Sequence, residues 1–329
     1  MAVIEAPTLD PRGTDHVVAA PGSAPRRPGR WGTAMFALAV VWLVVVLGGS
    51  MVVNWLPVAD PNVPARCADQ PPTVADHDGT LVLVPAPGCP LDIAADDHAS
   101  ALPSGRHWLG TDEVGRDVLS RILHGGQIVL IVGFGAVAVA LLIGTLAGMV
   151  AGFAGGPLGR AIDISFSILL AFPTIVLAIA VVAAFGRSVW AVSTAIAIVA
   201  VPAFGRLAKS QVVAVSDREF VMAARAIGAR PRRVLFGEIL PNIVPAMLSF
   251  YVLGVALAIV AEGGLAVLGL SVQEPTATWG GMIAAGRSVV ADYPSVALIP
   301  ALVMFGTVLS VNIVGDRIRS RFDIRESLL

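Results

Sequence analysis

Charged residues are scarce in this 329-residue chain, and their scarcity excludes whole classes of protein. Only 14% of the residues are Asp, Glu, Lys or Arg, whereas 56% are hydrophobic. Soluble domains carry about 25% charged residues, so a water-exposed globular fold is excluded and a lipid bilayer is the natural solvent. The net charge of −1 also lacks the basic excess that a nucleic-acid interface needs. We therefore expect membrane lipid, and no nucleic acid, as a partner.

Residues that carry chemistry inside a membrane are few as well. The chain has 2 Cys and 5 His, and none of them lies in a predicted span, so intramembrane nucleophilic or metal catalysis is not expected. A phosphate-binding loop needs glycine before its lysine, but Ala208 precedes Lys209-Ser210. The sequence therefore predicts no enzyme, no catalytic residue and no metal or cofactor bound by this chain.

Long hydrophobic runs are what the chain does have. A spanning helix needs about 20 apolar residues. Six segments meet this length: 32–54, 127–150, 162–185, 189–205, 243–271 and 296–315. Arg and Lys gather in alternate connecting segments, which places both chain ends in the cytoplasm. The sequence predicts an all-α integral membrane protein with six transmembrane helices, N-in and C-in.

This topology divides the chain into five parts. They are a cytoplasmic tail 1–30, a first transmembrane helix 31–54, an extracytoplasmic insertion 55–110, a membrane core 111–315 and a cytoplasmic tail 316–329. Cys67 and Cys89 both fall in the insertion, in an oxidising compartment, which favours a Cys67–Cys89 disulfide over two free thiols. Such a bond would stabilise the insertion by about 3 kcal/mol.

An amphipathic helix is predicted at 111–125, where the core begins. One face would carry Val114, Val118, Leu119, Ile122 and Leu123, and the other Asp112, Glu113, Arg116, Asp117 and Arg121. This pattern is typical of a helix that lies at the membrane surface. We expect it to lead into the second span.

The loop at 206–242 has a helix–turn–helix pattern. Ser216 or Asp217 would cap the first helix, and Gly228 would end it. Its apolar face is made by Phe220, Ala223, Ala224 and Ile227. A second helix would run from Pro231 to Leu240 and end at Pro241. A stripe of small residues suits insertion into a groove on another protein.

This loop resembles the "EAA" loop of binding-protein-dependent ABC importer permeases. The matching positions are Ala223, Ala224, Gly228, Leu240 and Pro241, while Met222 stands where the motif has Glu. The resemblance implies a loop that docks on a separate ATPase subunit. The residues expected to take part are Arg218, Glu219, Phe220, Met222, Ala223, Ala224, Ile227, Gly228, Leu240 and Pro241.

Three further stretches are similar to the C-type subunit of the dipeptide, oligopeptide and nickel permeases. They are 107–121, 261–280 and 312–317. The resemblance implies a permease in the inner or plasma membrane that pairs with a homologous permease, two ABC ATPase subunits that bind ATP and Mg²⁺, and an external substrate-binding protein. It implies import of di- or oligopeptides, with nickel or other metal chelates and haem as the alternatives.

Glu262 is the clearest ionisable residue inside a predicted span. With Gly263 and Gly264 it marks a possible break in the fifth span, where it would act in gating or hold the structure together. The alternative is an ion-coupled secondary transporter in which Glu262 carries the coupling ion. Uptake driven by ATP or by a proton gradient distinguishes these two functions.

Overall fold

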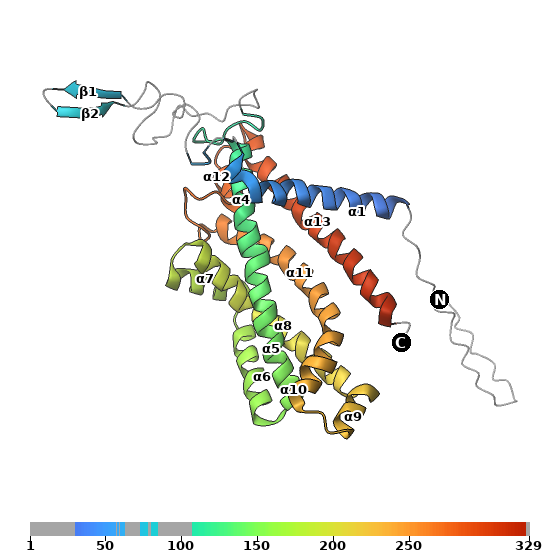
Figure 1. Ribbon diagram of the computed structural model, residues 1–329. Coiled ribbons are helices and arrows are strands. Elements are labelled where there is room, and N and C mark those ends of the chain that lie inside the picture. Colours follow the sequence, from blue (N-terminus) through green and yellow to red (C-terminus); the bar gives the residue numbers. More distant parts are fainter. Residues whose placement is uncertain are drawn as a thin grey trace, which may run out of the picture.

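The computed structural model describes residues 30–56, 58, 60–62, 73–77, 80–84 and 107–326. Nearly all of the described chain is helical (Figure 1). The exception is an antiparallel hairpin in the insertion, made of β1 (Thr73–His77) and β2 (Thr80–Val84), in which Thr73 pairs with Val84. Cys67 and Cys89 lie outside the described residues, so their disulfide stays a prediction.

Two long helical segments, each built from several consecutive helices, form the first part of the bundle. The first comprises α1 (Arg30–Leu43), η1 (Val44–Gly48), α2 (Gly49–Val52) and η2 (Val53–Trp55), and the second α4 (Val118–Val129), η3 (Leu130–Ala136) and α5 (Val137–Ala154). Next come α6 (Gly156–Ala171), α7 (Thr174–Phe185), α8 (Val189–Ser216) and α9 (Glu219–Ala226). The chain ends with α10 (Pro231–Arg233), η4 (Val234–Ile239), α11 (Leu240–Val267), α12 (Trp279–Ala285) and α13 (Pro294–Glu326).

Five of these helical segments are long and apolar enough to cross a membrane. They are Trp31–Trp55, Val118–Ala154, Val189–Ser216, Pro231–Val267 and Pro294–Ser320. A sixth span exists if α6 and α7 are counted together, but this pair is bent by 91°. The span predicted at 162–185 therefore consists of two helices that meet at a sharp bend. Pro173 bends the chain there, because it lacks an N–H and forces Phe172 into an extended conformation (ψ 137°).

Small residues allow α5 and α8 to pack closely at the centre of the bundle. A Cβ atom at Gly148 would lie 2.2 Å from the carbonyl oxygen of Gly205, and one at Gly144 would lie 2.6 Å from that of Val201. Any larger residue at these positions would separate the two helices. The contact fixes the position of α8, which leads directly to α9.

The helix formed by α1, η1 and α2 packs along α13 and leaves most of its outer face exposed (Figure 1). Trp42 fixes this contact, because its Nε1 donates to Thr307 Oγ1 at 3.1 Å and its ring covers Gly306. Trp31 at one end is 85% exposed and Trp55 at the other is 84% exposed. Tryptophan at both ends of a span is typical of the two membrane–water interfaces.

The predicted amphipathic helix over 111–125 is wrong. Residues 111–117 form a loop that is closed by a bridge between Thr111 and Asp117, and the helix begins only at Val118. Asp117 caps it, since its carboxylate accepts from the amide of Ser120 at 2.7 Å. The helix then continues as a span instead of lying on the surface.

Two predicted helix boundaries near the coupling loop are also wrong. Residues 206–216 belong to α8, so the segment between the spans is shorter than 206–242. The helix that begins at Pro231 does not end at Pro241 but continues to Val267. Pro241 follows the π-helical turn η4, where the hydrogen-bond register changes, and the helix accommodates its missing N–H there.

Candidate functional site

The segment 217–230 forms the compact turn at one end of the bundle that the EAA-like pattern predicts (Figure 1). Helix α9 begins after Arg218, which has an extended conformation and makes no side-chain cap, so the predicted cap at Ser216 or Asp217 is wrong. Glu219 lies in the first turn, where a negative charge suits the helix dipole.

The structure confirms the prediction that Gly228 ends helix α9. Its φ is +81°, and its amide donates to the carbonyl of Arg225 at 3.0 Å while that of Ala229 donates to Ala224 at 3.0 Å. These two bonds form a Schellman motif, which favours glycine at the position with positive φ. Arg230 and Pro231 then start the next helix at once.

One side of α9 is fixed against the bundle. Val221 is fully buried, Ala224 is half-buried, and the guanidinium of Arg225 lies 5.0 Å from the ring centroid of Phe153. Phe153 lies near the end of α5. The cation–π contact therefore links α9 to the 37-residue helix Val118–Ala154.

The other side of α9 is open and apolar. Ile227 is 87% exposed, Met222 54% and Phe220 42%, and Ala223 is exposed between them. Exposed apolar patches on protein surfaces are candidates for interaction sites, so this face is a candidate for one. The sequence predicted an apolar face made by Phe220, Ala223, Ala224 and Ile227. Three of these side chains are exposed, and that of Ala224 is half-buried.

A hollow of about 470 Å³ adjoins this face. It is lined by Ala224, Ile227, Gly228, Ala229, Arg230, Arg233 and Glu238. Leu240 and Pro241, which the motif includes, do not line it: Leu240 packs against the hydrophobic core, and Pro241 lies in the helix beyond. The structure thus brings together the α9 residues of the motif but not its Leu-Pro pair.

Glu262 lies near the opposite end of α11, in an unbroken helix, so the predicted break at Gly263-Gly264 is wrong. Its side chain is 5% exposed and accepts from Ser271 Oγ at 2.7 Å, and Thr278 and the amide of Gly280 also donate to it. Three donors from the following loop and α12 satisfy the carboxylate, which therefore holds this loop onto α11.

The close approach of Gly263 and Gly280 also holds α12 against α11. A Cβ atom at Gly280 would lie 2.7 Å from the Cα of Gly263, so α11 and α12 are in backbone contact. Gly264 has open space around it. Trp279 at the start of α12 is buried, and its Nε1 donates to the carbonyl of Ile122 in α4 at 2.8 Å.

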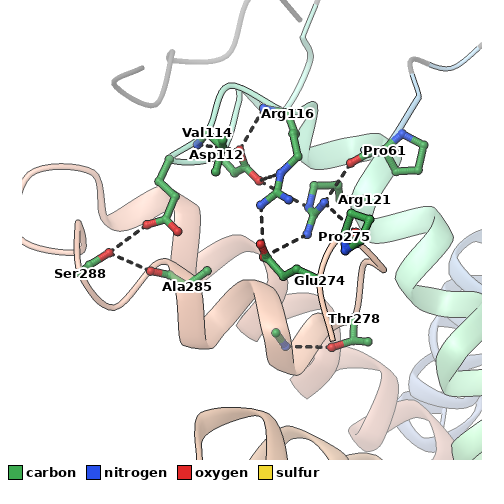
Figure 2. Close-up of polar contacts among 12 residues, drawn as sticks. Pro61, Asp112, Val114, Arg116, Arg121, Glu274, Pro275, Thr278, Ala285 and Ser288 are labelled. Carbon is green, nitrogen blue, oxygen red and sulfur yellow. Dashed lines mark hydrogen bonds and ion pairs between the residues drawn. The ribbon is translucent and has the colours of Figure 1, made fainter. Parts of the chain in front are cut away.

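A cluster of four charged side chains lies beside α12, and the sequence did not predict it (Figure 2). We call Asp112, Arg116, Arg121 and Glu274 the buried charge cluster. Arg116 Nε lies 2.7 Å from Asp112 Oδ2, and Arg116 Nη2 lies 3.2 Å from Glu274 Oε1. Arg121 Nε lies 3.4 Å from Asp112 Oδ2. Two cations and two anions thus share one site.

Neighbouring backbone groups complete the buried charge cluster. Asp112 Oδ1 accepts from the amides of Val114 and Arg116 at 3.0 and 2.9 Å, which shapes the 111–117 loop. Arg121 is only 2% exposed and donates to the carbonyl of Pro61 at 2.9 Å. The cluster therefore joins three segments that are far apart in the sequence, including the chain that follows the first helix.

The carboxylates stabilise the charge of Arg116. Burial alone lowers the pKa of Arg116, but the neighbouring Asp112 and Glu274 carboxylates raise it, and the net pKa lies above the ordinary value. Glu274 is the accessible member, with 57% of its side chain exposed. The spacing of acids and arginines in 112–121 was the available signal, but it indicated an exposed helix face.

Comparisons with known proteins agree with this architecture. The profile of the family described as "Binding-protein-dependent transport system inner membrane component" matches residues 144–325. The dipeptide transport system permease protein DppC of Alkalihalophilus pseudofirmus is 42% identical over 221 residues, 67% of this chain and 73% of the relative. The glutathione transport system permease protein GsiD of Pectobacterium atrosepticum is 39% identical over 227 residues, 69% of this chain and 75% of the relative.

A solved structure shares the fold. A chain of the MetNI methionine ABC transporter in an inward-facing conformation aligns with a TM-score of 0.51 and 16% identity, covering 61% of this chain and 96% of that one. The alignment supports the helical arrangement. The profile match and the relatives show that this multi-pass inner-membrane chain belongs to the binding-protein-dependent transport system inner membrane components, the permease subunits of ABC importers.

Proposed function

We propose that this chain forms half of the translocation pathway of an ATP-driven importer of di- or oligopeptides. Its relatives are permeases named for dipeptide and glutathione transport, and both are peptides. The observation that carries the mechanism is the open apolar face of α9, with Ile227 87% exposed beside a hollow. This face fits a groove on a separate ATPase subunit.

The partners follow from the same proposal. A homologous permease supplies the other half of the pathway, two ABC ATPase subunits bind ATP and Mg²⁺, and a substrate-binding protein delivers the peptide from outside. The α9 end then lies in the cytoplasm, and the insertion 55–110 lies outside. The gathering of Arg and Lys at the α9 end supports this orientation.

Two long helices carry movement of α9 through the chain. Arg225 contacts Phe153 at the end of the Val118–Ala154 helix, and the turn at Gly228 leads directly into the Pro231–Val267 helix. Both helices are continuous to the opposite end of the bundle, where Arg121 and Glu262 lie. A shift of α9 driven by the ATPases would therefore change how these helices pack, which is a ligand-driven shift between two states.

The ion-coupled alternative has little support from the environment of Glu262. The carboxylate accepts hydrogen bonds from Ser271, Thr278 and Gly280 and is 5% exposed. A group that exchanges an ion needs access to water during the cycle. We assign Glu262 to the structure of the α11–α12 junction.

Uptake by the reconstituted complex tests the proposed function. Proteoliposomes would contain this chain, its partner permease and both ATPases, with the binding protein added outside. We expect uptake of labelled dipeptides that depends on ATP, and weaker uptake of nickel chelates and haem. Dipeptide uptake driven by a proton gradient without ATP would contradict the proposal.

A further inference from the structure

A second hollow, of about 510 Å³, lies between α6 and α8. It is lined by Asp163, Ser167, Arg206, Lys209, Ser210 and Val213. This volume falls within the range of about 300–1,000 Å³ that small-molecule sites occupy. Five of its six side chains are polar, although α8 is long and apolar enough to cross a membrane and α6 meets the same test together with α7.

Helix geometry explains why these residues meet. Asp163 and Ser167 are one turn apart on α6, and the α8 residues recur at intervals of three or four. The helices approach closely because Phe166 of α6 packs on Gly205 of α8: a Cβ atom at Gly205 would lie 2.3 Å from the ring. The hollow is therefore held by rigid packing on one side.

The charges in the hollow leave one cation without a counter-ion. Lys209 Nζ pairs with Asp163 Oδ2. Arg206 donates to the neutral hydroxyl of Ser167 at 3.1 Å, and within the described part of the chain no carboxylate lies within ion-pair distance of it. Arginine is the side chain best suited to bind a carboxylate through two parallel hydrogen bonds.

The position of the hollow indicates that it faces water. Arg206 and Lys209 lie in the last three turns of α8, about 10–15 Å from its end at the rise of an α-helix. Charges at this depth are costly against lipid and normally face a water-filled cavity or a partner. Ser167 is also about one and a half turns from the 91° bend at Phe172-Pro173, and such a bend is tolerated where the backbone meets water or protein.

We propose that this hollow lines the aqueous pathway and binds the carboxylate of the transported peptide, with Arg206 as its main contact. The proposal rests on the proposed function and adds a contact site for the substrate. Because Lys209 neutralises Asp163, the hollow keeps one net positive charge, that of Arg206, and this charge attracts a carboxylate. The phosphate of a lipid is the other anion that this charge would attract, and the labelling experiment distinguishes the two.

Thiol labelling tests the site without relying on transport. Ser210→Cys would be introduced into the intact complex in inside-out vesicles, and a membrane-impermeant maleimide added, with the wild-type chain as the blank for Cys67 and Cys89. The probes are dialanine and dialanine amide, which differ only in the carboxylate. We expect Ser210→Cys to be labelled. Dialanine should slow labelling about tenfold at a concentration at which the amide leaves it nearly unchanged, because only dialanine has the carboxylate that Arg206 would bind.

Matched variants test whether Arg206 is the residue that binds dialanine. Adding Arg206→Gln should remove the protection by dialanine, Arg206→Lys should keep part of it, and Arg319→Gln, on the exposed tail of α13, should keep all of it. The proposal is overturned if Ser210→Cys is not labelled, if both probes protect equally, or if protection follows the content of anionic lipid. Uptake by the wild-type complex tests the proposed function separately, so the two can fail independently.

Discussion

The two ends of the bundle differ in whether their notable side chains are exposed or buried. At the α9 end, the apolar side chains of Phe220, Met222 and Ile227 are exposed and the helix is held by few contacts. At the other end, Asp112, Arg116 and Arg121 are buried and paired with one another. In the proposed function the open end docks on a partner, whereas the charges of the closed end pair with one another within the chain (Figure 2).

Because of this difference, we expect substitutions at the two ends to have different effects. A substitution at the α9 end should leave the chain folded and impair its connection to the ATPase. A substitution in the buried charge cluster should impair the fold itself, because an unpaired buried charge is costly. The following predictions test this contrast from the largest expected effect to the smallest.

Arg121→Ala should have the largest effect. It would leave Asp112 with one cation fewer in a buried site and remove the hydrogen bond to Pro61, at a cost of about 3–5 kcal/mol. The measurement is the thermal stability and yield of the purified complex. Arg287→Ala, at an exposed position near the same end, is the control and should change little. A loss below about 1 kcal/mol for Arg121→Ala would show that the cluster does not stabilise this end.

Ala223→Glu should separate ATP hydrolysis from transport without unfolding the chain. Ala223 is exposed on the open face, where a larger charged side chain would block close docking at a cost of about 1–3 kcal/mol. We expect the ratio of peptide uptake to ATP hydrolysed to fall about tenfold. Ala223→Ser is the conservative control. Ala224→Glu, at the half-buried neighbour, should lower both coupling and stability, and normal coupling in either glutamate variant would refute docking through this face.

Arg225→Ala should have a smaller effect on coupling. It removes the contact with Phe153, which contributes about 1 kcal/mol at a partly exposed site. Coupling should fall a few-fold while the unfolding temperature changes little. Arg225→Lys retains a cation over the ring and should restore most of the coupling. If Arg225→Ala transports normally, α9 does not act through the Val118–Ala154 helix.

Glu262→Gln should have the smallest effect on transport. The amide oxygen can still accept from Ser271, and one lost hydrogen bond costs about 1 kcal/mol. ATP-driven uptake should remain within a few-fold of that of the unsubstituted complex. Complete loss of uptake, with the complex still assembled and hydrolysing ATP, would favour ion coupling through this residue.

Local signals in the sequence predicted the α9 end well. The Ala-Ala pair, Gly228 and the surrounding apolar residues indicate a short helix that ends at glycine, and the structure confirms both the helix and its Schellman end. These features depend on residues within a few positions of one another. The hydrophobic runs likewise predicted where the spans lie, because length and composition decide this, although the run at 162–185 forms two helices bent by 91°.

Long-range contacts explain what the sequence could not predict. Arg116 pairs with Glu274, which is 158 positions away, so its burial cannot be read from the 111–125 pattern. The carboxylate of Glu262 likewise depends on donors from a later loop, and α11 is continuous through Gly263 and Gly264. At Pro241 the preceding π-helical turn overrides the usual tendency of proline to end a helix.

Cross-linking from Ile227→Cys tests the central claim, that α9 docks on an ATPase subunit, most directly. Ile227 is 87% exposed at the end of α9. The control is Trp190→Cys: Trp190 is 76% exposed and lies at the start of α8, the end of that helix far from α9. In membrane vesicles that contain the whole complex, a short bifunctional thiol–amine reagent should join Ile227→Cys to the ATPase subunit, to an extent that changes with ATP, and should not join Trp190→Cys. Failure of Ile227→Cys to reach any ATPase subunit, or its modification only from outside the cell, would contradict the account.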